Sequence, residues 1–220
     1  MFRLLPALTG TCPSCEADWP EEDGLCADCR VRLFTPIELP GLIALGYYRG
    51  NLRRTVRAFK FAGNRRLARP LGTAVAAQVA AAGWKIDCIA YVPVSRRGRR
   101  ERGFDQAREL AEVVRRELGK PLLHLLNRKE SGSKQSRLDP LQRIANAYQS
   151  YAPARAYAPA RVLLIDDVYT TGATASACRD ALVSIVASKV LLAVVALAPK
   201  RSPLALMAGQ GDDGKDGNRA

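Results

Sequence analysis

The sequence predicts an α/β fold, in which a parallel sheet is flanked by helices, behind a small cysteine-rich ribbon. Short apolar runs such as Val162–Ile165 are typical of strands that are buried on both faces. Other segments, such as Gly50–Phe61, repeat apolar residues at helical spacing. Two C-x2-C pairs precede all of these segments. Together these observations indicate one main domain with a metal-binding module in front of it.

Length and composition fit this division. The 220 residues suffice for one domain and a small appendage, and 48% of them are apolar, which is ample for a core. We expect the ribbon at residues 1–38, the α/β domain at 39–200 and a disordered tail rich in Gly, Asp and Lys at 201–220. No apolar run reaches the roughly 18 residues of a membrane span. The expected location is the cytoplasm.

The positive charge is concentrated in the main domain. The formal net charge is +13, which indicates an anionic partner. Residues 39–86 contain no acid, whereas residues 1–38 carry more acids than bases. The bases of the first segment are Arg49, Arg53, Arg54, Arg57, Lys60, Arg65, Arg66, Arg69 and Lys85. Four of them, Arg49, Arg53, Arg57 and Lys60, form one stripe along the predicted helix Gly50–Phe61, which is either a solvated face or one that contacts phosphate or nucleic acid.

The ribbon has the spacing of a structural metal site. Cys12, Cys15, Cys26 and Cys29 form two C-x2-C knuckles, the usual way to place four thiolates around Zn²⁺. So short a segment cannot bury a core, so the metal would supply its folding free energy. Two disulfides are the alternative, which a reducing cytosol disfavours. Because the segment is acidic, we expect it to dock a protein or to be purely structural.

The elements of the main domain follow in order. Apolar runs predict strands and helical spacing predicts helices, and the single histidine, His124, is expected in the core, as are Cys88 and Cys178. The predicted strands are Leu42–Tyr48, Ile86–Val94, Pro121–Leu126, Val162–Ile165 and Val190–Ala198. The predicted helices are Gly50–Phe61, Leu67–Ala82, Phe104–Leu118 and Ala175–Val183.

An arginine run follows the strand that ends at Val94. Ser95–Phe104 reads S-R-R-G-R-R-E-R-G-F and predicts an electropositive loop at the carboxyl end of that strand. The planar guanidinium group binds phosphate oxygens in a bidentate manner. The sequence therefore predicts anion binding at this edge of the sheet.

A second chemical motif follows the strand Val162–Ile165. Asp166 and Asp167 come directly after it, and the small, hydroxylated turn Thr170–Thr174 opens the next helix. Ligands of open α/β sheets bind outside the carboxyl ends of the strands, and a turn of this kind suits a phosphate. Paired acids suit ribose hydroxyls or a Mg²⁺ shell. The alternative is a strand–turn–helix with a solvated acidic corner.

This stretch resembles the phosphoribosyl-pyrophosphate (PRPP) motif of type I phosphoribosyltransferases. The resemblance implies a phosphoribosyltransferase-like sheet, PRPP as ligand together with Mg²⁺, and catalytic positions at Asp166 and Asp167, which would hold the ribose. In that family the loop at the position of Ser95–Arg97 holds the pyrophosphate. The implied PRPP-binding residues are Thr170, Thr171, Gly172, Ala173, Thr174, Ser95, Arg96 and Arg97.

The whole chain from Cys12 to Ala198 resembles the ComF family, including its GntX-like branch. The resemblance is carried by the four cysteines, Y-R-G-N-L-R at 48–53, R-G-F-D-Q-A at 102–107, and Gln135, Leu138, Arg143 and Asn146. It implies a competence protein that supports the uptake of single-stranded DNA at the inner membrane, with a helicase or recombination mediator as partner. Arg128–Asn146 would be a mobile hood over the substrate. Asp105, where Asn is expected, and Gly132, where Thr is common, depart from the pattern.

Three functions are compatible with these motifs. Arg99, Arg100 and Arg102 exceed the needs of one pyrophosphate and are predicted to track a single-stranded DNA backbone. The favoured interpretation is a competence factor that binds PRPP and single-stranded DNA. An active phosphoribosyltransferase is the alternative, although Thr170 stands where enzymes for 6-oxopurines place a carboxylate. PRPP sensing without chemistry is the third. The acceptor base, the partner surface and the oligomeric state are not identified.

Overall fold

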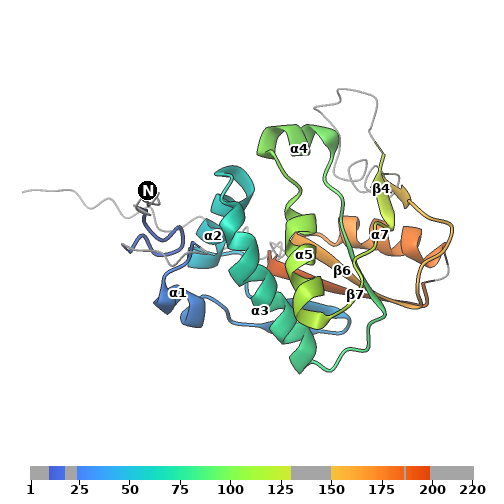
Figure 1. Cartoon of the computed structure of the whole chain (residues 1–220), viewed down its shortest axis with the longest axis horizontal. Coiled ribbons are helices and arrows are strands. Elements are labelled where there is room, and N and C mark those ends of the chain that lie inside the picture. The colour runs from blue at the N-terminus through green and yellow to red at the C-terminus, as the bar shows by residue number, and fades with distance from the viewer. Residues whose placement is uncertain (1–9, 18–23, 130–149, 186, 199–220) are drawn as a thin grey trace, which may run out of the picture.

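The computed structural model describes residues 10–17, 24–129, 150–185 and 187–198. Its centre is a five-stranded sheet with the order β1-β2-β7-β6-β3, in which only β1 is antiparallel to its neighbour (Figure 1). The strands are β1 (Ile37–Leu39), β2 (Leu42–Ala44), β3 (Cys88–Tyr91), β6 (Arg161–Tyr169) and β7 (Lys189–Leu197). The predicted α/β class with a parallel sheet is confirmed.

Helices cover both faces of this sheet. On one face lie α2 (Gly50–Phe61), α3 (Ala68–Ala81) and α5 (Gln106–Leu118), with the short 3₁₀ helix η1 (Arg65–Leu67) between the first two (Figure 1). On the other lie α7 (Ala173–Val183) and the hairpin of β4 (Leu126–Arg128) and β5 (Tyr151–Pro153). Two further helices, α1 (Ala27–Arg32) and α4 (Arg96–Arg102), lie at the edges.

The inner strand β6 is largely apolar because both of its faces are covered. Leu163 and Ile165 belong to the core beneath α2, α3 and α5, whereas Val162 and Leu164 belong to the core beneath α7. Side chains alternate between the faces of a strand, so a strand buried on both sides shows a continuous apolar run. The same holds for β7. Cys88 and Cys178 lie fully buried in the second core, as predicted.

Several predicted helices are confirmed, one of them to the residue. Gly50–Phe61 is helical over its whole predicted length, and α3 and α5 begin and end within two residues of the prediction. The last two pack tightly, since a Cβ placed on Gly72 of α3 would lie 2.6 Å from Cβ of Val113 on α5. Glycine is therefore required there for close helix contact. Among the described residues, no helix has the length and apolarity needed to cross a membrane.

The predicted arginine loop is wrong, because these residues form helix α4. The Ser95 hydroxyl oxygen caps the helix by accepting a hydrogen bond from the Gly98 N–H at 3.0 Å. Arg97 and Glu101 form an ion pair of 2.7 Å one turn apart, and Gly103 ends the helix at φ +79°. Cap, ion pair and glycine stop all favour a helix over a loop.

Two predicted strands are also corrected. Pro121–Leu126 is not a strand: within it only Leu122 makes an isolated bridge, to Ile89, before the chain turns outward to β4. His124 is consequently exposed and not a core residue as expected. The predicted strand Leu42–Tyr48 ends at Ala44, with a separate bridge at Tyr47. In each case the neighbouring strand offers backbone partners to part of the apolar run and not to the rest.

Some expectations lie outside the described residues. They concern most of the Arg128–Asn146 hood, including Gln135, Leu138, Arg143 and Asn146, and the tail at 201–220. The proposed division at residue 38 falls within β1, which pairs with β2 of the main sheet. The domain boundaries stay a prediction.

Candidate functional site

The four N-terminal cysteines converge on one point. The Sγ atoms of Cys12, Cys15, Cys26 and Cys29 all lie within 4.8 Å of one another. A tetrahedral Zn²⁺ with Zn–S bonds of about 2.3 Å separates its ligand sulfurs by roughly 3.8 Å. The arrangement therefore fits a structural metal ion such as zinc, with no coordination position left for a substrate.

This cluster is joined to the core of the main domain. Cys12 and Cys29 are buried, and Leu25, between the two knuckles, is fully buried in the same core as Phe59 and Leu67. At its surface, Arg54 of α2 pairs with Glu16 at 3.2 Å. The ribbon is therefore packed against α2 and η1 and is not a free appendage.

The second candidate site lies where β3 ends and β6 continues. Tyr91 is the last residue of β3 and pairs with Ile165, whereas β6 extends to Tyr169 beside β7. The next two residues of β6 are Asp166 and Asp167, whose side chains point to opposite faces of the sheet. The chain after Tyr91 leaves the sheet toward α4, and this departure opens space at the carboxyl end of β6.

The two acids have different surroundings. Asp167 is 8% exposed, and its Oδ1 lies 2.8 Å from Nζ of Lys60, at the end of α2. Asp166 accepts a hydrogen bond of 2.8 Å from the Asp167 N–H. Burial, followed by the charge of Asp167, raises the pKa of Asp166 to about 8. Ionising Asp166 therefore carries a free-energy cost at this site.

The threonine turn begins α7. Thr170 and Thr171 are exposed, and Gly172 adopts φ +81° as the cap of the helix. A Cβ on Gly172 would overlap the hydroxyl oxygen of Tyr169, so both the backbone and the space require glycine. The eleven-residue helix that follows directs its first N–H groups toward the same end of the sheet as the acids.

A cavity of about 170 Å³ connects these groups. Two buried nitrogens in its walls, Nε2 of Gln106 and Nε of Arg102, have no hydrogen-bond partner among the described residues. The orientation of the Gln106 amide is set by Arg102, whose guanidinium donates to Oε1 at 3.1 Å. The polar lining of the cavity consists of Lys60, Arg102, Asp105, Gln106, Arg128, Tyr151, Asp166, Asp167 and Thr174.

Unpartnered buried donors are costly, at about 1–3 kcal/mol each, and therefore uncommon in folded proteins. Gln106 is only 2% exposed, so solvent does not satisfy it. The lining of one small space thus combines two acids with an arginine and a glutamine, each of which has one buried nitrogen without a partner among the described residues. This pattern suits a ligand that carries both hydroxyl groups and acceptor oxygens.

Only some of the residues predicted to form the site line the cavity. Asp166, Asp167 and Thr174 line the cavity, while Thr170, Thr171, Gly172 and Ala173 form the turn beside it. Ser95, Arg96 and Arg97 form the first turn of α4 and do not line it. Of the arginines assigned to DNA, Arg102 lines this cavity, Arg99 lines a larger neighbouring one, and Arg100 is exposed and lines neither.

Four cavity residues were not singled out from the sequence: Lys60, Gln106, Arg128 and Tyr151. Gln106 lies in the R-G-F-D-Q-A segment, so the resemblance offered a signal for it. Lys60 was one basic residue among nine between residues 39 and 86, and nothing local distinguishes it. Asp105, which departs from the ComF pattern, caps α5 by accepting from the Arg108 N–H at 3.2 Å.

Comparisons with known proteins give one informative relative. No family model matches the chain. The competence protein ComFC of Bacillus subtilis (strain 168) is 29% identical over 176 residues, which cover 77% of this chain and 70% of that protein. The chain is thus a distant homologue of ComFC, in agreement with the resemblance to the ComF family seen in its motifs.

Among solved structures, TT1426 from Thermus thermophilus matches with a TM-score of 0.36 and 22% identity. The alignment covers 64% of this chain and 77% of that one. A likeness at this level carries no argument about the site.

Proposed function

We propose that this protein binds PRPP with Mg²⁺ at the carboxyl end of β6 and acts on single-stranded DNA during natural transformation. The observation that supports the first part is a cavity that is lined by Asp166 and Asp167 together with Arg102 and Gln106, each of which has one buried nitrogen without a partner among the described residues. A ribose phosphate offers hydroxyl donors to the carboxylates and acceptor oxygens to the nitrogens. If the acidic corner were purely structural, no ligand oxygen would offset the cost of burying these two nitrogens without acceptors.

Each part of the ligand has a matching group. The ribose hydroxyls would donate to Asp166 and Asp167, and the phosphate would accept from the Thr170–Thr174 turn at the start of α7. Arg102 lies over the ring of Phe61, with its guanidinium carbon 5.5 Å from the ring centre, which holds the guanidinium in place. The site is therefore largely formed before ligand arrives.

The cavity also fits Mg²⁺ that arrives with the ligand. Mg²⁺ takes oxygen ligands, and the carboxylates of Asp166 and Asp167 are suitable ones. Asp167 is already paired with Lys60 and Asp166 with a backbone N–H, so most of the coordination would come from PRPP and water. The ion would neutralise charge on the pyrophosphate group.

The DNA part of the proposal draws on the homology and on charge. The relative is named a competence protein, and the net charge here is +13. A cytoplasmic protein at the DNA-uptake machinery, with a helicase or recombination mediator as partner, is consistent with both. Retention of a labelled single-stranded oligonucleotide on a filter, with affinity that falls steeply as salt rises, tests this part.

An active phosphoribosyltransferase is the second candidate. It is favoured by the same cavity, because carboxylates beside a ribose stabilise positive charge that develops on the sugar during transfer. Thr170 is exposed and cannot take a proton from a base at neutral pH. Incubation with PRPP, Mg²⁺ and a panel of bases decides the matter: pyrophosphate release supports the transferase, and its absence together with DNA binding supports the competence function.

The decisive test of the PRPP site is a double substitution. Asp166→Asn with Asp167→Asn keeps side-chain shape but removes two charged acceptors, each worth about 1.5–3 kcal/mol. We expect calorimetry to show PRPP binding weakened by at least about a hundredfold. Asp180→Asn removes an exposed acid of α7 outside the cavity and is the matched control. Equal PRPP affinity in all three proteins would contradict the assignment.

A further inference from the structure

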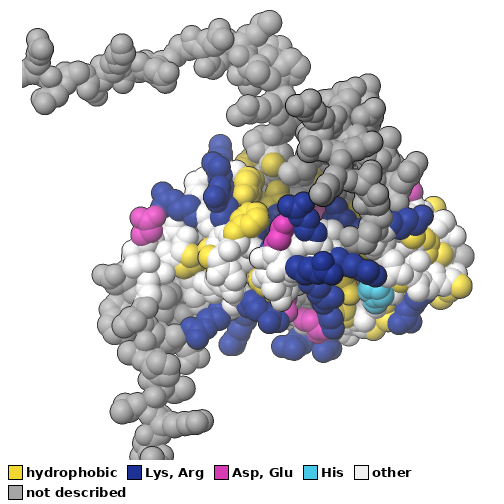
Figure 2. Space-filling view, turned by 90° about the horizontal axis from the view of Figure 1, so that it is seen from above, with side chains coloured by type: hydrophobic (Ala, Val, Ile, Leu, Met, Phe, Trp, Pro, Cys, Tyr) yellow, Lys and Arg dark blue, Asp and Glu magenta, His cyan; other side chains and the backbone are white. Residues whose placement is uncertain are grey.

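A second, larger cavity lies outside the PRPP-type cavity. It has a volume of about 810 Å³ and runs along α5, between α4, the end of β3 and β4. In Figure 2, basic side chains gather beside the single histidine, His124, which lies in its wall. The polar residues of this arginine groove are Tyr91, Arg96, Arg99, Asp105, Arg108, Glu112, Arg115, His124, Asn127 and Arg128.

The groove is electropositive because five arginines and only two acids, Asp105 and Glu112, line it. Glu112 pairs with Arg115 at 2.6 Å. Asp105 accepts from the backbone N–H groups of Val94 at 3.3 Å and Arg108 at 3.2 Å. The arginines Arg99, Arg108 and Arg128 add further positive charge to the lining of the groove. Such a wall attracts an anion with several charges.

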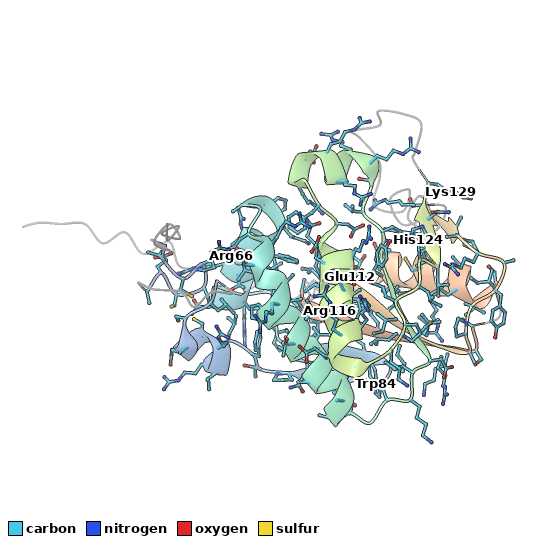
Figure 3. All side chains as sticks on the ribbon, in the orientation of Figure 1. Arg66, Trp84, Glu112, Arg116, His124 and Lys129 are labelled. Atoms are coloured by element: carbon cyan, nitrogen blue, oxygen red, sulfur yellow. The ribbon has the colours of Figure 1, made fainter. Side chains whose placement is uncertain are left out.

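One wall of the groove is aromatic and held rigidly. The ring centres of Tyr91 and His124 are 5.8 Å apart, and the Tyr91 hydroxyl donates to Nδ1 of His124 at 2.9 Å. Nε2 of His124 donates in turn to Oδ1 of Asn127 at 3.0 Å. Figure 3 shows His124 near β4 and Glu112 on α5, and both residues line the groove. These fixed rings offer a stacking surface next to the arginines.

We propose that the arginine groove binds the phosphate backbone of single-stranded DNA and that a base stacks on the Tyr91–His124 wall. This inference rests on the proposed function for its partner and assigns the surface. Basic grooves with aromatic faces are the common device for binding single strands without sequence preference. A volume of about 810 Å³ is far more than one phosphate requires and lies in the range of about 300–1,000 Å³ typical of organic ligands.

The groove differs from the surface expected from the arginine run alone. Arg99 and Arg108 belong to it, from α4 and α5, whereas Arg100 and Arg116 on the same helices are exposed and do not line it. The groove and the PRPP-type cavity share the wall residues Pro93, Val94, Asp105 and Arg128. A strand in the groove would therefore lie next to the ligand in the cavity.

The test compares two double variants with equal loss of charge. Arg99→Ala with Arg108→Ala removes two groove arginines, and Arg100→Ala with Arg116→Ala removes their neighbours. Binding of a fluorescein-labelled oligothymidylate is measured by anisotropy between low and physiological salt. We expect the groove variant to bind at least about tenfold more weakly, with a salt slope reduced by about 0.7 for each phosphate that is no longer neutralised. The control variant keeps the wild-type slope.

The stacking of a base on the Tyr91–His124 wall is tested separately with variants of His124. His124→Ala should weaken oligothymidylate binding by about tenfold, and His124→Phe should recover most of it, because every base can stack on an aromatic face. An abasic oligomer of equal length keeps the phosphates and lacks the bases, so it should not distinguish the two variants. Equal affinities of His124→Ala and wild type for oligothymidylate would overturn the stacking interaction.

The remaining outcomes separate this inference from the PRPP site. Equal losses in the two arginine double variants would overturn the groove in favour of diffuse charge. Competition by polyglutamate as strong as that by DNA would mean a protein partner and would also overturn it. Wild-type protein that binds PRPP but no oligonucleotide overturns the groove and leaves the PRPP site standing. Oligonucleotide binding that depends on Arg99 and Arg108, without PRPP binding, supports the groove and refutes the PRPP site.

Discussion

The cysteine cluster and the cavity at the end of β6 are both polar sites, but they are built in opposite ways. All four thiols come from residues 12–29, and they converge without help from the sheet. The cavity takes its polar walls from residues between Lys60 and Thr174, which belong to several helices and strands. The first site is local in sequence and the second exists only in the folded domain.

This difference sets how each site affects stability. The cysteine cluster has a complete ligand set, so a bound metal adds to the folding free energy. The cavity holds buried donors and a buried ion pair, which cost free energy unless a ligand or partner satisfies them. A protein that keeps such groups unpartnered in a small space gives up stability for binding. Changing the two sites in turn tests this contrast, beginning with the largest effect.

Metal removal should have the largest effect. The purified full chain should contain about one zinc per molecule by elemental analysis. Because Cys12, Cys29 and Leu25 share a core with Phe59, stripping the metal with a chelator should unsettle the main domain as well. We expect Tm to fall by at least about 10 °C, as a loss of several kcal/mol implies for a chain of this size. A metal-free protein with unchanged Tm would show that the cluster is not a metal site.

The Lys60–Asp167 pair should give the next largest change. Lys60→Met leaves a carboxylate that is 8% exposed without its partner, which should lower the free energy of unfolding by about 3–5 kcal/mol. Adding Asp167→Asn removes the unpaired negative charge, so the double variant should recover most of the lost free energy of unfolding. Urea unfolding of the wild type, the two single variants and the double variant measures the coupling free energy between Lys60 and Asp167. Additive losses would mean that the pair contributes nothing.

Substitution of Gln106 should weaken PRPP binding with little effect on the free energy of unfolding. Gln106→Met removes the unpartnered Nε2 donor but also the Oε1 that accepts from Arg102, so the free energy of unfolding should change by no more than about 1 kcal/mol. PRPP affinity should fall by about tenfold, because one ligand oxygen loses its donor. Calorimetry and urea unfolding on the same preparation check both directions. A variant that loses stability and keeps PRPP affinity would assign Gln106 to the fold alone.

The last prediction concerns pH, where the change in stability is small for each pH unit. Because the pKa of Asp166 is raised to about 8 in the folded protein, the unfolded chain releases this proton at lower pH than the folded one. The folded state then binds more protons between about pH 4 and 8, and stability falls as pH rises through this window, by at most about 1.4 kcal/mol per unit. Asp166→Asn should flatten the slope of unfolding free energy against pH. An unchanged slope would show that Asp166 ionises normally.

The parts of the fold that depend on neighbouring residues could be predicted from the sequence. The Cys12–Cys15 and Cys26–Cys29 spacings give the metal cluster, and the apolar stripe of Gly50–Phe61 gives a helix with correct ends. The apolar run before Asp166 likewise predicts a strand of the sheet, although β6 does not end at Ile165 but continues through both acids to Tyr169.

The parts that depend on distant contacts could not. Lys60 and Asp167 meet only because α2 packs on the face of the sheet toward which the Asp167 side chain points, and the sequence holds no sign of this pairing. The arginine run was predicted as one surface, but helix α4 turns its side chains in three directions, toward the cavity, the groove and solvent. His124 is exposed because its segment leaves β3 after one bridge, a departure that no apolar pattern encodes.

The early end of β3 has one more consequence. The Val92 N–H makes the last backbone bond to β6, at the Ile165 carbonyl, so the amide of Asp167 faces a place where no strand continues. The Asp166 carboxylate accepts that amide in place of the missing neighbour. A sugar whose hydroxyl groups bind the Asp166 carboxylate would release the Asp167 N–H from its hydrogen bond. This backbone N–H of β6 could then donate a hydrogen bond to the ligand in the cavity.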